Sequence, residues 1–310
     1  MISIQSSSSS GSLRHGTPDR TPRQALQAGD SPSASSCPSP EAITGRSHIS
    51  FSQVSCYQSC PKAFEFKYVL RADPAFVSSS LIFGTAFHEA VAQTSQADLE
   101  GAPRPSVVEL AATVGQQLRA PSVPLQLARG ESLESLNALA SRMLTAYLAS
   151  PESHVHGTSI CIEDVVRGVV DPSVPVVEAR VDHVYQRPDG SLVIRDVKTT
   201  RIKWSEDKVA ESSPQLQLYA MLLDRELVGL GKVEALEFLT VTKAAKPVVR
   251  LHQVPVAKDG CRNLVDQLRQ VWHGIHSGVF PARPGWPCKT CPFNDRCPAT
   301  IKPSGAFDAP

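Results

Sequence analysis

The sequence predicts an α/β fold, because helical patterns lie on both sides of a run of strand patterns. Apolar residues recur with helical spacing up to residue 149, and the character of the chain changes at Ser159. Segments rich in Val and Ile and bounded by Pro or Gly then predict strands at 160–170, 176–185 and 192–197. The rest of the expected core is a helix at 214–230, strands at 233–242 and 248–256, and a helix at 263–277.

The amino-terminal half of the chain is expected to be helical. Ser52 is a suitable cap for a helix through Tyr57, and Pro61 fits the first turn of the next helix. Further helices are expected at 81–94, 105–120 and 132–149, which makes 100–150 a helical insertion. Two segments are expected to lack order: the Ser- and Pro-rich tail 1–46 and the flexible tail 301–310.

Composition limits the classes of protein that the chain can be. Its 310 residues are 41% hydrophobic and 20% charged, which is typical of a globular protein. No apolar run is long enough for a transmembrane helix, and no secretory signal is recognisable, so a cytoplasmic protein without a membrane partner is expected. The net charge is only +1, so any contact with DNA must come from a local basic patch.

A predicted hairpin in the middle of the chain carries three charged residues of interest. Residues 187–190, Arg-Pro-Asp-Gly, are a turn signal, so antiparallel pairing would bring Asp182 close to Asp196 and Lys198. Two facing carboxylates repel unless a cation lies between them, and oxygen ligands suit Mg²⁺ or Mn²⁺. The hairpin therefore indicates a metal site beside a lysine, although the same residues also occur as ordinary strand charges.

Two helices carry weaker signals. Gly84 would permit close backbone approach at the start of its helix, and His88 could supply an imidazole to the same metal. Gln215 and Tyr219 are four residues apart, hence on one helical face, and could hydrogen-bond a phosphate or orient the lysine. Taken alone, each of these patterns is more typical of ordinary packing.

Four cysteines suggest a second centre. Cys288, Cys291 and Cys297 lie close together near the carboxyl terminus, and Cys60 precedes a proline far upstream. Without a secretory signal, a disulfide framework explains them poorly, and convergence on a metal explains them better. Four thiolates can bind zinc or a [4Fe–4S] cluster, so their spacing leaves both open.

Taken together, the motifs resemble the RecB-like branch of the PD-(D/E)XK nuclease superfamily. The resemblance spans residues 49–298 and is carried by Ser50-Phe-Ser52, Cys60-Pro61, Phe64, Gly84 with His88, Asp182, Asp196-Val-Lys198-Thr, Gln215 with Tyr219, and the three later cysteines. It implies a restriction-endonuclease-like core in a nuclease domain at 47–300, with a mixed central sheet flanked by helices and a carboxyl-terminal cysteine-rich region. The chain departs from the usual Gly-x-Ile/Val-Asp pattern in having Ala179 at the first place.

The resemblance also implies a role for each residue. The ligands of the catalytic Mg²⁺ or Mn²⁺ would be His88, Asp182, Asp196 and the backbone carbonyl of Val197. Lys198 would position or deprotonate the attacking water, while Gln215 and Tyr219 would support the site and the DNA strand. The cysteine arrangement is similar to that of iron–sulfur members, including CRISPR-associated adaptation nucleases. It implies a [4Fe–4S] cluster that ties the two ends of the domain together, with structural Zn²⁺ as the alternative.

Basic residues that follow two of the motifs mark an expected DNA path. They are Lys62, Lys67, Arg71, Arg201 and Lys203, with Trp204 among them. Basic residues beside an aromatic suit single-stranded DNA, through phosphate contacts and base stacking. A solvated charged surface explains the same residues equally well.

The expected function is a metal-dependent DNA exonuclease that acts on single-stranded DNA or DNA ends, in repair, recombination or related DNA processing. No Gly-x-x-x-x-Gly-Lys-Ser/Thr sequence is present, so unwinding would need a helicase partner; a CRISPR adaptation complex is the other expected partner. The alternative is a catalytically silent DNA-binding or assembly subunit of such a complex. The intact set of two aspartates and a lysine argues against it.

Overall fold

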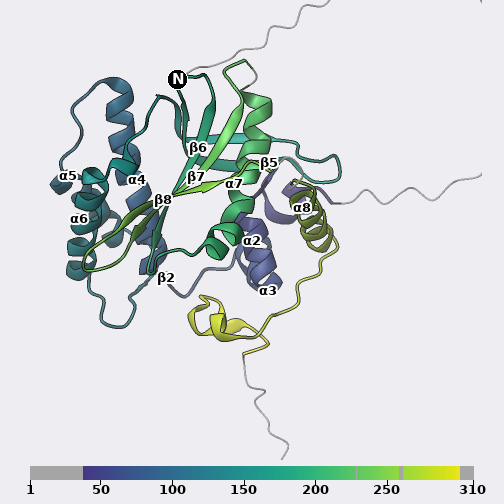
Figure 1. Ribbon diagram of the computed structural model, residues 1–310. Coiled ribbons are helices and arrows are strands. Elements are labelled where there is room, and N and C mark those ends of the chain that lie inside the picture. The colour runs from purple at the N-terminus through teal and green to yellow at the C-terminus, as the bar shows by residue number, and fades with distance from the viewer. Residues whose placement is uncertain (1–37, 228, 258–260, 301–310) are drawn as a thin grey trace, which may run out of the picture. The chain divides into compact units, whose positions relative to one another are not determined.

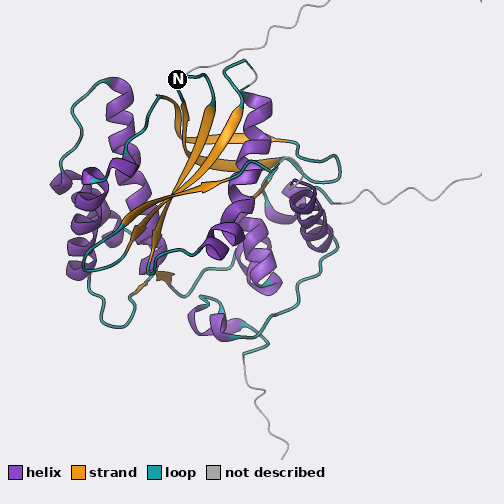
Figure 2. Ribbon diagram, viewed as in Figure 1, coloured by secondary structure: helices purple, strands orange, loops and turns teal. Residues whose placement is uncertain are grey.

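A mixed β-sheet lies at the centre of the protein, with helices on both of its faces (Figures 1 and 2). The structure is a computed structural model, which describes residues 38–227, 229–257 and 261–300. The strands are β1 (Ile49–Ser50), β2 (Val77–Ser78), β3 (Leu125–Gln126), β4 (Thr158–Gly168), β5 (Val177–Gln186), β6 (Leu192–Thr200), β7 (Val233–Thr242) and β8 (Val249–Val254). The main sheet has the order β1-β5-β6-β7-β8 with β4 also paired to β5, while β2 and β3 form a separate pair. The predicted mixed-sheet α/β fold is therefore confirmed.

The helices follow the predicted order, with shifts at their ends. They are α1 (Pro40–Thr44), α2 (Phe51–Ser59), α3 (Pro61–Phe64) followed by a π-helical turn (Glu65–Val69), α4 (Ser79–Glu100), α5 (Val107–Arg119), α6 (Leu133–Ala149), α7 (Glu206–Glu226) and α8 (Cys261–His276). After α8 the described chain forms two short 3₁₀ turns, at Trp286–Thr290 and Asn294–Arg296. Among these described helices, none combines the length and the apolar character that a bilayer crossing requires.

Capping explains three departures from the predicted helices. The cap of α2 is Ser50 rather than Ser52, because the Ser50 side chain accepts from the N–H of Gln53 and the Gln53 side chain accepts in return from the N–H of Ser50. Helix α7 begins well before Pro214, since Ser205 caps it and the proline lies inside the helix. Helix α1, capped by Ser39, lies in the segment that was expected to be disordered up to residue 46. Residues 1–37 and 301–310 of the predicted tails lie outside the described residues.

Apolar side chains pack on both faces of the sheet and bury β6 between two cores. Ile194 belongs to the core that includes residues of α2, α7 and α8, and Val197 belongs to the core formed with α4, α5 and α6. Burying one such aliphatic side chain stabilises the fold by about 1.5–3 kcal/mol. Because β6 is held on both faces, the side chains that project from it have fixed positions.

One edge of β5 is shared between two strands, which creates an opening in the sheet. Along its other edge, β5 pairs with β4 over almost its whole length. On the shared edge, β1 pairs with residues 177–178 and β6 pairs with residues 183–186. Residues 179–182 therefore lie between two partners, and Asp182 comes at the point where β6 diverges from β5.

Candidate active site

The six side chains predicted to form the site line one cavity of about 850 Å³. They are His88 from α4, Asp182 from β5, Asp196 and Lys198 from β6, and Gln215 and Tyr219 from α7. The β5–β6 pairing is antiparallel, as the hairpin signal predicted, and Gly190 closes the turn with a positive φ of 85°. Side chains from four elements thus converge at the opening in the sheet.

Asp182 is the centre of the hydrogen bonding in this cavity. Its Oδ2 accepts a 2.8 Å bond from the backbone N–H of Val197 and lies 3.0 Å from Nδ1 of His88. Burial alone would raise the pKa of Asp182, but the contacts with His88 and Lys198 outweigh it and hold that pKa below its ordinary value. Burial lowers the pKa of His88, and the bond to Asp182 with the charge of Asp182 more than reverses this, so that pKa lies above its ordinary value. Asp182 is therefore an oriented, ionised carboxylate; the role of the Val197 carbonyl stays a prediction.

Asp196 is fully buried and lacks satisfactory hydrogen bonds. Nζ of Lys198 lies 2.6 Å from Oδ2 of Asp196, yet neither oxygen of this carboxylate accepts a hydrogen bond of acceptable geometry. Burial raises the pKa of Asp196 to about 6; the charge of Lys198 opposes this rise and that of Asp182 adds to it. Burial lowers the pKa of Lys198, but the two aspartates reverse the shift and place it above its ordinary value. Lys198 offsets part of the cost of burying this carboxylate, and the donor set fits a divalent cation bound by oxygen ligands.

Glu163 on β4 is a further carboxylate of the site, and the sequence analysis did not predict it. It lies opposite Asp182, because the flanking pairs join Ile162 to His183 and Asp164 to Val181. Ligand atoms of Glu163, Asp182 and His88 all lie within 4.8 Å of one another. The φ of Glu163 is +53°, a left-handed conformation that is uncommon for residues other than glycine and that recurs at functional sites.

The helical residues of the site are placed as their spacing indicated. Nε2 of Gln215 donates a 2.5 Å hydrogen bond to the hydroxyl of Tyr219, one turn along α7. Burial, with the negative charge of Asp196, raises the pKa of Tyr219, so the phenol stays protonated. The close backbone approach expected at Gly84 does not require glycine, because a Cβ added there would meet Oγ1 of Thr199 at an ordinary contact distance of 3.8 Å.

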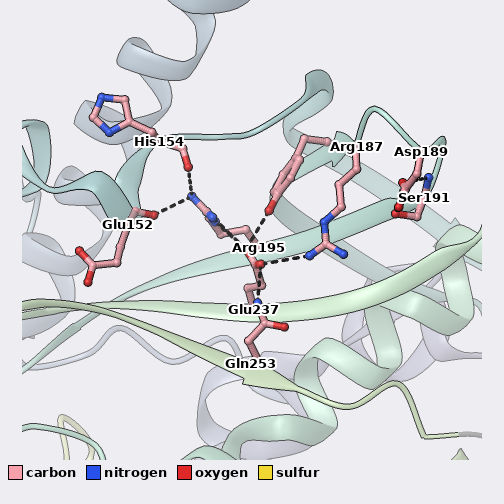
Figure 3. A network of polar contacts seen from close by, with 9 residues as sticks. Glu152, His154, Arg187, Asp189, Ser191, Arg195, Glu237 and Gln253 are labelled. Atoms are coloured by element: carbon pink, nitrogen blue, oxygen red, sulfur yellow. Dashed lines mark hydrogen bonds and ion pairs between the residues drawn. The ribbon is translucent and has the colours of Figure 1, made fainter.

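A buried polar network fixes the opposite face of β6 (Figure 3). Arg195 donates to Oε2 of Glu237 on β7 with bonds of 3.0 and 2.9 Å, and Tyr185 donates to the same oxygen over 3.1 Å. The guanidinium also reaches the carbonyls of three residues after α6, Glu152, Ser153 and His154. Because Arg195 precedes Asp196 on β6, this network restrains the strand directly behind the face that carries Asp196 and Lys198.

The four predicted cysteines line a second cavity, which has a volume of about 30 Å³. All four are free thiols, and burial raises the pKa of Cys291, with Cys60, Cys288 and Cys297 adding to that rise. No three of these four sulfur atoms lie within 4.8 Å of one another. Tetrahedral zinc would bring its sulfur ligands to about 3.8 Å. The thiols therefore face one space at a wider spacing than zinc imposes.

The six residues of the expected DNA path do not line the large cavity. Lys62 forms an ion pair with Glu65, and Lys67 lies 5.0 Å from the ring centre of Tyr68. Arg201 lies 3.3 Å from Glu131. The ring of Trp204 packs against Phe238 and His252, with ring centres 5.2 and 6.1 Å away. Trp204 is therefore partly a packing residue, and contact of these residues, with Arg71 and Lys203, to DNA stays a prediction.

The family profile of the PD-(D/E)XK nuclease superfamily matches residues 48–298. The chain belongs to this superfamily. Membership confirms the predicted superfamily and the nuclease interpretation at this level, while the RecB-like branch stays a prediction. It also accounts for the mixed sheet and for an acidic site suited to a divalent metal.

Two solved structures give further comparisons. The crystal structure of a candidate exonuclease from Eubacterium rectale has a TM-score of 0.51 and 12% identity, over 86% of this chain and 94% of that chain. At this identity the likeness shows the fold alone. The structure named SSO0001 aligns over 81% of this chain and 94% of that chain, with 14% identity and a TM-score of 0.36, and carries no argument. The comparison with curated proteins found no match.

Proposed function

We propose that the protein is a metal-dependent DNA exonuclease that acts on single-stranded DNA or DNA ends. The observation that carries this proposal is the convergence of His88, Asp182, Asp196 and Lys198 in one cavity, with the Asp196 carboxylate fully buried beside Lys198. This donor set supports Mg²⁺ or Mn²⁺ as the bound ion. The ion would polarise the scissile phosphate and lower the pKa of a bound water.

The remaining steps belong to the side chains of the chain itself. His88 and Asp182 would hold the ion together with Asp196, and Glu163 is close enough to join them. The raised pKa of Lys198 keeps its ammonium charged, which suits orienting the attacking water and the phosphate better than removing a proton. Tyr219, held by Gln215, stays neutral and can donate a hydrogen bond to a phosphate oxygen.

A [4Fe–4S] cluster is the second part of the proposal. Its support is that Cys60 and the three carboxyl-terminal cysteines line one cavity. Bound there, the cluster would tie the start of α3 to the end of the described chain. Anaerobically purified protein should be brown with broad visible absorption; a colourless protein that carries stoichiometric zinc would contradict this part.

The nuclease proposal is tested with end-labelled single- and double-stranded DNA and Mn²⁺. The wild type should release nucleotides from ends, and Asp196→Ala and Lys198→Ala should each abolish this while remaining folded. Asp189→Ala is a matched control, because Asp189 accepts a 2.9 Å bond from the Ser191 N–H in the hairpin turn and does not line the cavity. Full activity in either active-site variant would overturn the assignment. A wild type that is inactive on every DNA would favour a silent subunit of a helicase-nuclease or CRISPR adaptation complex.

A further inference from the structure

Arg180 is an accessible cation in a cavity that has more carboxylates than cations. The cavity is lined by four carboxylates, those of Glu89, Glu163, Asp182 and Asp196. Among the described residues that line it, Arg180 and Lys198 are the side chains with a permanent positive charge. The Lys198 ammonium is engaged by Asp196, whereas the Arg180 side chain is 68% exposed. A polyanionic substrate that enters this space can therefore reach Arg180.

The backbone aims Arg180 at the metal-binding carboxylates. Arg180 and Asp182 are two residues apart on β5, so their side chains share one face of the strand. Nε of Arg180 lies 2.8 Å from Oε2 of Glu163, while the other oxygen of Glu163 lies 4.0 Å from Nδ1 of His88. Glu163 thus holds the guanidinium beside the candidate metal site.

We propose that Arg180 binds a phosphate of the DNA strand next to the scissile one, and that Glu163 positions it. This inference rests on the proposed nuclease function. A guanidinium has five donors in a planar fork that matches a phosphate, and the 2.8 Å contact with Glu163 is made by Nε. An exposed ion pair contributes little stability. Arg180 can therefore exchange its contact with Glu163 for a contact with a phosphate at little cost in free energy.

A second arginine on the same two strands provides a matched control. Arg167 on β4 pairs with Glu178 on β5, with Nη2 at 2.6 Å from Oε2. Its side chain is 60% exposed, close to the value for Arg180, but it does not line the cavity. Removal of either arginine deletes one exposed cross-strand ion pair, and removal of Arg180 alone changes the charge of the cavity.

The test measures the affinity for a single-stranded oligonucleotide with Ca²⁺ in place of Mn²⁺, as a function of salt concentration. Arg180→Gln should weaken binding about five- to tenfold and lower the slope of log K against log salt by about 0.7, the value for one phosphate contact on a single strand. Arg180→Lys should keep the slope, because the charge remains, and recover part of the affinity. Arg167→Gln should behave as the wild type.

Two outcomes would overturn the inference. One is an unchanged salt slope in Arg180→Gln, and the other is an equal loss of slope in Arg167→Gln. If the wild type cleaves DNA and either outcome is seen, the nuclease proposal stands and the role of Arg180 fails. If the wild type neither binds nor cleaves DNA, both proposals fail together.

Discussion

The carboxylate site and the cysteine cavity differ in what holds them in place. The site lies on β5 and β6, whose backbones are paired in a sheet and whose side chains pack into cores on both faces. Around the cysteines the described chain forms single turns, such as the bonds from Cys291 N–H to the Cys288 carbonyl at 3.2 Å and from Cys297 N–H to the Asn294 carbonyl at 3.5 Å. The first site should therefore keep its shape without a ligand, whereas the second should depend on what its sulfurs bind.

The strongest test of this difference is Asp182→Asn, which keeps the side-chain size but removes a charged ligand. Cleavage with saturating Mn²⁺ should fall at least about 1,000-fold, because the ion loses an anionic partner. The melting temperature, followed by circular dichroism, should change by less than about 3 °C, because the sheet remains intact. Loss of the folded transition in this variant would show that the site is not preformed.

The cysteine cavity should respond in the opposite way. Cys291→Ser should remove the visible absorption, lower the melting temperature by about 5 °C or more, and expose the carboxyl-terminal segment to protease, since the bound centre links distant segments. Cys161→Ser is the control, because Cys161 is a half-buried free thiol on β4 that does not line the cavity. Equal absorption and melting temperature in Cys291→Ser and the wild type would contradict the linking role.

Lowering the pH should weaken metal binding at the carboxylate site and leave the cysteine cavity unaffected. Metal binds ionised carboxylates, and burial raises the pKa of Asp196 to about 6, so protons should compete with the metal below that pH. At pH 5 most of Asp196 would be protonated, and the affinity for Mn²⁺ by calorimetry should be several-fold weaker than at pH 7. No carboxylate or imidazole is found among the described residues that line the cysteine cavity, so the visible absorption should stay constant. Equal Mn²⁺ affinity at pH 5 and 7 would contradict the buried, proton-competing site.

The smallest expected effect concerns the supporting helix. Tyr219→Phe removes a buried hydroxyl that accepts from Gln215, and cleavage should slow about two- to tenfold, as expected for one hydrogen bond. Tyr185→Phe removes a hydroxyl from the Arg195–Glu237 network behind β6. It should lower the melting temperature with little change in cleavage rate. A larger catalytic loss in Tyr185→Phe than in Tyr219→Phe would reverse the assigned roles.

The sequence predicted those parts of the fold that follow from local patterns. Alternating and β-branched residues located β7 at residues 233–242, where the structure has it. The two-residue strands β1, β2 and β3 were missed, because a pairing that short leaves no periodicity to read. The start of α7 was predicted at Pro214, but the Ser205 cap begins the helix earlier and Pro214 lies inside it.

The site could be predicted as far as its residues belong to motifs. The six motif side chains line one cavity, but Glu163 was missed because its position depends on the pairing of β4 with β5. Its left-handed backbone conformation also has no sequence signal, since glutamate is not a residue that favours it. Arg180 was not among the predicted site residues, although it lines the same cavity.

The division of one edge of β5 between β1 and β6 has a consequence for chain length. Strand β1 pairs with residues 177–178 of β5, and β6 pairs with residues 183–186. These two pairings fix the number of β5 residues that lie between the partner strands. Loss of one residue between them would turn the following side chains to the other face and move Asp182 away from His88 and Val197. This segment should therefore tolerate exchange of side chains at positions such as Ala179 far better than any insertion or deletion.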